Sequence, residues 1–220
     1  MTMTNDPWSA RAQSYVESDA HRQGADLDLI VAWAEGAQNA LDVATGGGHV
    51  ARRLREAGID AMTCDPSAGM KPDVICRAEE LPFATGSFDL VACRIAPHHF
   101  DDVALAVKEM ARVSRDLVLI VDTVNMGEAF ELAEKLRDPS HIRNYSEQEW
   151  RGFCEGAGLE IVERQIVERE IDLVAWLART GCEGETAARV IELLDERVKD
   201  GRMRLDAIAI RARKRNGEPA

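Results

Sequence analysis

From residue 40 onward, short apolar runs alternate with amphipathic stretches of helical length. The runs predicted as strands are 40–44, 60–64, 73–76, 88–93, 117–122, 160–168 and 204–213. The stretches predicted as helices between them are 49–57, 101–113, 127–136 and 146–156. This alternation predicts an α/β fold in which a mostly parallel sheet is covered by helices.

Four further helical patterns do not belong to this alternation. Two of them, 10–18 and 25–35, precede the first strand, and two others, 171–180 and 185–199, interrupt the hairpin of the last two strands. Either pair is suited to cover a site at the edge of the sheet. We therefore expect one domain over residues 1–220: a helical cover (1–36), a core of sheet and helices (37–170), a helical insertion (171–201) and the last strand (202–214).

Charge and hydropathy exclude several kinds of partner. The formal charge is −12, which disfavours nucleic acid and anionic membrane surfaces because both are bound by clustered basic residues. A spanning helix needs about 20 apolar residues, whereas the longest stretch without Asp, Glu, Lys or Arg is 43–51. With no secretory pattern in residues 1–19, we expect a soluble, cytoplasmic protein.

A glycine-rich turn follows the first predicted strand. Gly46, Gly48 and Ala51 satisfy the G-x-G-x-x-G/A pattern of dinucleotide binding, and Asp65 ends the next strand 19 residues after Gly46, where a carboxylate can bind ribose hydroxyls. Asp42 lies four residues before the glycines and would face a pyrophosphate of like charge. A ligand with an ammonium group and a sulfonium, such as S-adenosylmethionine (SAM), suits two acidic strand ends better. NAD remains the alternative ligand.

Several motifs follow one another along the chain. They are LDVATGGG (41–48), CDPS (64–67) continuing to Met70, AEELPF (78–83), GSFD (86–89), RIAPHHF (94–100), EMARV (109–113) and RNYSE (143–147), with SYV (14–16) near the start. With these motifs the chain resembles class I SAM-dependent methyltransferases. It is most similar to the group related to the C-methyltransferases of ubiquinone and menaquinone biosynthesis.

The resemblance implies a Rossmann-like sheet of seven strands in the order 3-2-1-4-5-7-6, with the last strand antiparallel and helices on both faces. SAM would lie across the carboxyl ends of the first strands and leave as S-adenosylhomocysteine. Asp65 would hold the ribose, the glycines would pass under the methionine part, Met70 would flank the adenine, and Ala78 with Glu79 would line its edge. The cofactor residues implied in full are Tyr15, Asp42, Ala44, Gly46, Gly48, Asp65, Pro66, Met70, Ala78, Glu79 and Arg94.

The chain departs from the family pattern in a few places. Ala44 stands where the family has its first glycine, and a strand-like backbone there would tolerate alanine. The segment between Asp65 and Ala78 is too short for the usual helix, so we expect a more open adenine pocket. Arg77 replaces a usual carboxylate, and the usual Pro-Gly-Gly turn is missing at 114–116.

Methyl transfer is an in-line displacement, so a base is needed only to deprotonate the acceptor. His98 and His99 follow the fourth strand, and an imidazole is suited to remove a phenol or enol proton near neutral pH. Arg94 ends that strand, where the family faces both cofactor and substrate. Adjacent side chains diverge, so His98 and His99 are not predicted to bind a metal, and packing or capping is their alternative role.

The predicted activity is methyl transfer from SAM to a carbon or oxygen of a small aromatic or quinol-like acceptor, by a monomer or a homodimer. One alternative is a SAM-binding protein without transfer activity that serves as a partner or sensor. The other is an NAD-dependent oxidoreductase.

Overall fold

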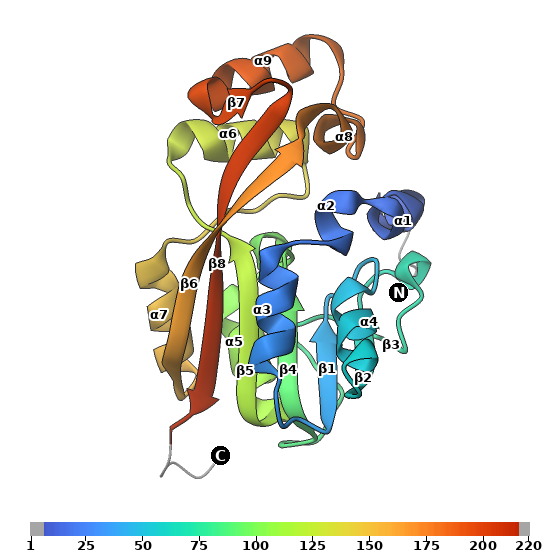
Figure 1. Ribbon diagram of the computed structural model, residues 1–220, viewed down its shortest axis with the longest axis vertical. Coiled ribbons are helices and arrows are strands. Elements are labelled where there is room, and N and C mark those ends of the chain that lie inside the picture. Colours follow the sequence, from blue (N-terminus) through green and yellow to red (C-terminus); the bar gives the residue numbers. More distant parts are fainter. Residues whose placement is uncertain (1–6, 216–220) are drawn as a thin grey trace.

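The computed structural model describes residues 7–215. Its centre is one sheet in the order β3-β2-β1-β4-β5-β8-β6, with the short β7 paired to β8 (Figure 1). The strands are β1 (Asn39–Val43), β2 (Asp60–Asp65), β3 (Val74–Ile75), β4 (Phe88–Arg94), β5 (Ser114–Thr123), β6 (Leu159–Asp172), β7 (Val198–Lys199) and β8 (Arg202–Lys214). Because β8 is the seventh strand of the prediction and runs antiparallel to β5 and β6, the predicted order is confirmed.

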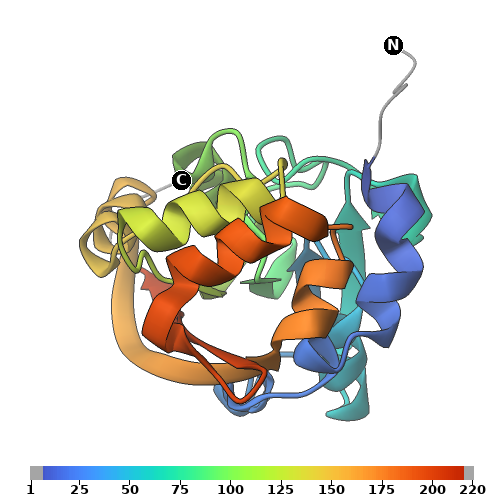
Figure 2. The ribbon, with the colours of Figure 1, turned by 90° about the horizontal axis from the view of Figure 1, so that it is seen from above.

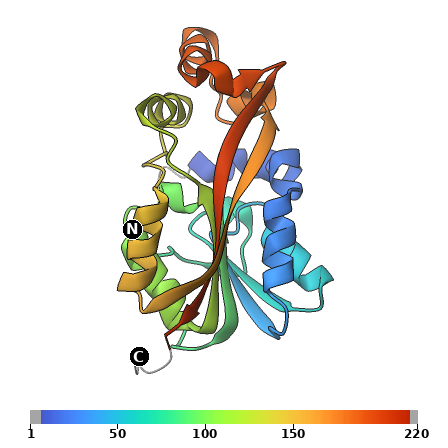
Figure 3. The ribbon, with the colours of Figure 1, turned by 60° about the vertical axis from the view of Figure 1, so that its left-hand side comes forward.

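Helices cover both faces of the sheet, as predicted. They are α1 (Pro7–Glu17), α2 (Asp19–Arg22), α3 (Ala25–Trp33), α4 (His49–Glu56), α5 (Val103–Val113), α6 (Glu128–Arg137), α7 (Glu147–Gly156), α8 (Leu173–Ala178) and α9 (Gly184–Leu194). Three short 3-10 turns lie at Ala68–Met70, Pro97–His99 and Asp195–Arg197. Figure 3 shows α3 and α4 on one face and α5 and α7 on the other.

Each face has its own apolar core. Trp150 of α7 and Met110 of α5 are buried on one side, and Leu27 and Ile30 of α3 are fully buried on the other, against residues of the sheet and α4. Since α3 packs on the sheet, only α1 and α2 of the predicted N-terminal cover lie beyond its carboxyl edge (Figure 1). Residues 1–6 of that predicted cover lie outside the described residues.

Strands β6 and β8 continue past the end of β5 as a two-stranded ribbon. β8 pairs with β5 through Ala207–Arg213 only, but with β6 from Arg202 to Lys214. The outer part of this ribbon carries a third core that contains Phe130 of α6, Trp176 of α8 and Val190 of α9. As a result α6, α8 and α9 overhang the carboxyl ends of the parallel strands (Figure 2).

Two predicted element boundaries in this overhang are wrong. The helix predicted over 171–180 begins only at Leu173, because β6 runs to Asp172, whose side chain then accepts a hydrogen bond from Ala175 N and caps α8. The helix predicted over 185–199 ends at Leu194. Asp200 and Gly201 have φ values of 51° and 73°, which is the turn chemistry of an Asp-Gly hairpin, and they join β7 to β8.

Among residues 7–215, none of the helices is both long enough and apolar enough to cross a bilayer.

Candidate active site

A cavity of about 300 Å³ lies at the carboxyl ends of β1, β2 and β4. Its walls include every residue that the sequence assigned to the cofactor except Gly48, which precedes α4 as its N-cap. The assigned residues on the wall are Tyr15, Asp42, Ala44, Gly46, Asp65, Pro66, Met70, Ala78, Glu79 and Arg94. Of the two histidines, His99 lines the cavity and His98 does not.

The turn between β1 and α4 has a left-handed backbone at several positions. The φ values are 53° at Ala44, 50° at Gly46 and 74° at Gly48. The expectation of a strand-like conformation at Ala44 is therefore wrong: the chain turns there, and alanine occupies a region that favours glycine. A Cβ at Gly47 would lie 2.7 Å from His49 Nε2 and 2.9 Å from the carbonyl oxygen of Tyr15, so this glycine admits α1 against the turn.

The carboxylate of Asp65 ties two loops together. Oδ2 accepts a hydrogen bond from Gly46 N at 3.0 Å, and Oδ1 accepts one from Ser67 N at 2.9 Å. These two bonds fix the carboxylate at the end of β2, on the wall of the cavity. The segment after Asp65 is short, as predicted, and holds only a 3-10 turn and the two-residue β3.

Asp42 is the most deeply buried acid on the cavity wall, with 1% of its surface exposed. Its Oδ2 accepts hydrogen bonds from Thr45 Oγ1 at 2.5 Å and from Ala51 N at 3.1 Å. Burial raises the pKa of Asp42 to about 6, against these two donors. A cationic group placed beside Asp42 would favour the ionised form.

Arg94 is held by groups that precede the sheet in the chain. Its Nε donates to Asp26 Oδ2 at 2.6 Å, and its Nη1 donates to the carbonyl oxygen of His21 at 2.9 Å. Its Nη2 is buried without a hydrogen-bond partner. Arg94 therefore joins the end of β4 to α3, lines the cavity and keeps one buried donor without a partner.

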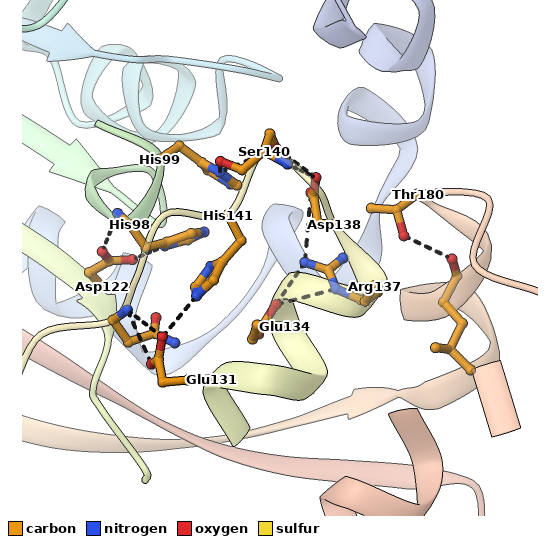
Figure 4. A network of polar contacts seen from close by, with 12 residues as sticks. His98, His99, Asp122, Glu131, Glu134, Arg137, Asp138, Ser140, His141 and Thr180 are labelled. Carbon is orange, nitrogen blue, oxygen red and sulfur yellow. Dashed lines mark hydrogen bonds and ion pairs between the residues drawn. The ribbon is translucent and has the colours of Figure 1, made fainter. Parts of the chain in front are cut away.

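His98 forms a buried pair with Asp122, which ends the apolar run of β5 (Figure 4). His98 Nδ1 lies 2.6 Å from Asp122 Oδ1, and the backbone N of His98 donates to Oδ2 at 2.9 Å. Burial lowers the pKa of His98 to about 3 and raises that of Asp122 to about 7. Nδ1 donates to the carboxylate in the neutral imidazole, which leaves Nε2 with its lone pair.

His99 has a different support. Its Nδ1 lies 3.0 Å from the carbonyl oxygen of Ser140, which can only accept, so Nδ1 carries the proton. Burial lowers the pKa of His99 to about 3. Both imidazoles are therefore neutral at physiological pH, and the reason given from the sequence, titration near neutrality, does not hold for this buried pair.

The structure adds residues that sequence patterns did not single out. His141, whose ring centroid lies 5.5 Å from that of His98, contacts Glu131 Oε2 through Nε2 at 3.1 Å (Figure 4). Asp122 carries a recognisable signal, since it ends a predicted strand as Asp65 does. No signal in the sequence marks Asp26 or His141, because they reach the site from segments far away in the chain. Among the described residues, no cluster of three or more histidine, cysteine or acidic side chains is suited to hold a metal ion.

A small chamber of about 50 Å³ adjoins the cavity beyond His99. Tyr15, His21, Ile95 and His99 line both spaces, and His98 lines the chamber only. Ile95 has a φ of 51°, which is strained for a β-branched residue and occurs where surrounding structure holds it. The chamber is thus the space next to the cavity into which both histidines can reach.

Helix α1 covers the cavity from the side of β2. Ser9 Oγ accepts a hydrogen bond from Gly69 N at 2.9 Å, and His49 Nε2 lies 3.0 Å from the carbonyl oxygen of Tyr15. The ring of Trp8 packs on that of His99 with 4.7 Å between centroids. These contacts place α1 as a wall shared by the cavity and the chamber.

Comparison with known proteins gives a consistent result. Residues 41–121 match a family described as "Methyltransferase domain". The chain is 31% identical to the uncharacterized methyltransferase YcgJ of Bacillus subtilis (strain 168), over 99% of this chain and 94% of that protein. It is 35% identical to a demethylmenaquinone methyltransferase of Beutenbergia cavernae, over 41% of each chain.

The fold is similar to solved structures as well. The crystal structure of the YcgJ protein from Bacillus subtilis superposes with a TM-score of 0.76 at 26% identity, covering 87% of this chain and 99% of that chain.

Proposed function

Because this chain belongs to the family of SAM-dependent methyltransferases, we propose that it transfers a methyl group from SAM to a carbon or oxygen atom of a small aromatic or quinol-like acceptor. The observation that carries the proposal is the cavity at the carboxyl ends of β1, β2 and β4, joined at His99 to a second space. The similarity to a demethylmenaquinone methyltransferase supports the acceptor class. A SAM-binding protein without transfer activity has no use for the second space.

The cavity residues fit the chemical groups of SAM. Its volume, about 300 Å³, falls in the range of small-molecule sites. Asp65, on the cavity wall at the end of β2, would accept hydrogen bonds from the ribose hydroxyls, and Asp42 offers a carboxylate to the ammonium group. The buried Nη2 of Arg94, which has no partner, suits the carboxylate at the other end of the methionine part. Gly46 and Ala44 would lie beside that part, Met70 and Pro66 beside the adenosine, and Ala78 and Glu79 at the adenine edge.

When bound, SAM supplies a methyl group on a positively charged sulfur. The carbon–sulfur bond breaks as the bond to the acceptor forms, and the acceptor loses a proton. This chain's contribution is to align the acceptor and to exclude water from it. Helix α1 and the overhang of α6 and α8 enclose the chamber for that purpose.

We propose that Nε2 of His98 accepts the proton that the methyl acceptor loses. Asp122, 2.6 Å from Nδ1, would stabilise the imidazolium that forms, as a buried carboxylate does in other histidine-based sites. His99 Nδ1 lies beside the carbonyl oxygen and the hydroxyl of Ser140, at 3.0 and 3.4 Å. Neither is a carboxylate, so His99 gains no such support and serves as the wall where the two spaces meet. Arg94 acts on the cofactor side and transfers no proton.

Two measurements test this function. Calorimetry with S-adenosylhomocysteine, SAM and NAD tests the ligand: micromolar binding of NAD without binding of either SAM form would overturn the proposal in favour of an oxidoreductase. Transfer of labelled methyl groups to phenols, quinols and enols tests the reaction. Binding of SAM with no transfer to any of them would favour the silent binding protein.

The base assignment is tested with Asp122→Asn and His98→Ala. Both should lower turnover by ~10² to 10⁴ while the dissociation constant of S-adenosylhomocysteine stays the same. His99→Ala should change the KM of the acceptor more than turnover. If His98→Ala keeps full turnover from pH 6 to pH 9, His98 is not the base.

A further inference from the structure

The chamber next to the cofactor cavity is lined by an unusual number of arginines. Arg137 comes from the end of α6, Arg169 from β6 and Arg179 from the residue after α8. Only one acidic side chain, Glu134, lines the chamber with them among the described residues. The chain as a whole has a charge of −12, so this local excess of positive charge runs against the composition of the protein.

Two acids, Glu134 and Asp138, lie close to Arg137. Glu134 Oε2 accepts two hydrogen bonds from Arg137, at 2.9 and 3.3 Å. Asp138 does not line the chamber. Its Oδ1 accepts hydrogen bonds from Ser140 N and Oγ (Figure 4) and from Arg11 Nη1, whereas its buried Oδ2 lies 3.9 Å from Arg137 Nη2 without a hydrogen-bond partner. Among the side chains that the structure describes, no carboxylate lies within ion-pair distance of Arg179. Its guanidinium lies 5.7 Å from the centre of the Tyr15 ring.

Arg137 has a buried donor that no protein group in the described residues satisfies. It is 6% exposed, and its Nη1 is buried without a hydrogen-bond partner. The guanidinium carbon lies over the Trp176 ring, 4.3 Å from its centre, and Glu134 accepts two hydrogen bonds from the same guanidinium, so the unused donor is held in place. A buried donor left unpaired costs free energy, and an anion in the chamber would satisfy it.

The two ends of the chamber differ in charge. His98 and His99 are kept neutral by burial, which lowers the pKa of each to about 3, so they face a neutral group such as a hydroxyl. The other end holds the guanidiniums, and burial together with Arg137 lowers the pKa of Arg179. Arg169 and Arg179 also line a wider polar groove that opens outward between α1, β6 and α8, which provides an approach for the ligand.

We infer that the methyl acceptor is a small carboxylic acid, whose carboxylate is bound by Arg179 and Arg137 and whose hydroxyl or enol group faces His98 and His99. A carboxylate matches the planar fork of a guanidinium, and the small chamber suits it. This inference rests on the proposed methyl transfer at the same site. It narrows the aromatic acceptors to those that carry an acid group.

The test uses matched pairs of compounds, namely 4-hydroxybenzoate and 3-(4-hydroxyphenyl)propionate with the amide of each. Calorimetry is carried out with the whole chain saturated with S-adenosylhomocysteine. We expect the acids to bind at least about tenfold more tightly than their amides, and Arg179→Met to weaken the acids by about 10- to 100-fold without changing the amides. Arg179→Lys should keep part of the preference.

Arg189→Met is the matched control, because Arg189 lies on the exposed side of α9 and pairs with Glu192. It should leave both acids and amides unaffected, and urea unfolding of each variant reports whether it folds. Equal binding of acids and amides, binding of neither, or an acid preference that survives in Arg179→Met would overturn the inference. If the unaltered chain does not bind S-adenosylhomocysteine, the proposed methyltransferase reaction is overturned instead.

Discussion

We predict that Asp42 lowers the free energy of unfolding of the ligand-free protein, because its carboxylate is buried. Its pKa rises from 3.8 to about 6, and each pKa unit corresponds to about 1.4 kcal/mol. The ionised form is therefore disfavoured in the folded state by about 3 kcal/mol at most. Asp42→Asn removes that penalty, and its side-chain oxygen can still accept from Thr45 Oγ1 and Ala51 N, which both donate to one oxygen in the native protein.

The pH dependence of the free energy of unfolding sets the direction of the predicted effect. An acid whose pKa is higher in the folded state lowers stability as pH rises, because the unfolded chain releases its proton first. The penalty is absent well below pH 3.8 and complete above about pH 6. Asp42→Asn should thus be more stable than the native protein, and the gap should widen by about 1.4 kcal/mol between pH 5 and pH 8.

Urea unfolding at pH 5, 6, 7 and 8 without ligand measures the gap. Asp60→Asn is the control, because Asp60 is exposed at the start of β2 and its substitution removes the same charge without a burial penalty. The same Asp42→Asn protein should bind S-adenosylhomocysteine at least about tenfold more weakly, since a charge-assisted contact to its ammonium group is lost. A variant that is less stable at pH 8, or whose advantage does not grow with pH, would refute the reasoning.

Two backbone predictions concern the same cavity. Ala44→Gly should raise the free energy of unfolding by about 0.5 to 1 kcal/mol, because Ala44 has a φ of 53°, whereas Ala61→Gly in a buried strand should lower it. Gly69→Ala should push α1 away, because its Cβ would collide with the backbone of Ser9; hydrogen exchange in residues 8–17 should then become faster and S-adenosylhomocysteine should bind more weakly. Gly152→Ala, where a Cβ meets nothing within 4 Å, is the control for Gly69→Ala, and unchanged exchange in Gly69→Ala would mean that α1 does not depend on this contact.

Much of the cofactor side was predictable from the sequence, because its determinants are local. The first strand, the glycines and the helix after them are contiguous, and Asp42 and Asp65 are set at strand ends by the same short segments. Parallel strands carry their ends to one edge of a sheet, so residues at those ends meet without further information. Ala44 was misjudged because one residue type does not reveal whether its backbone is extended or left-handed.

The acceptor side was less predictable, because its contacts join distant segments. Arg94 meets Asp26, 68 positions earlier, and His98 meets Asp122, 24 positions later. Nothing in the pattern of β6 singled out Arg169, since a charged residue on a strand usually faces solvent. The outer ribbon of β6 and β8 decides its placement, and that ribbon was expected to stop sooner than it does.

The cofactor cavity and the chamber beside it are built largely from different segments of the chain. The residues that line the cofactor cavity from β1 onward lie within 42–101, inside the segment 41–121 that matches the family. Arg137, Arg169 and Arg179 all lie after that segment and are held by α6, α8 and the ribbon, which have a core of their own. A change in this third core can therefore alter the acceptor site without disturbing the cofactor cavity. We therefore expect related chains with the same motifs up to β5 to share the cofactor cavity, while the acceptor of each has to be inferred from the residues that its own overhang places beside the positions of His98 and His99.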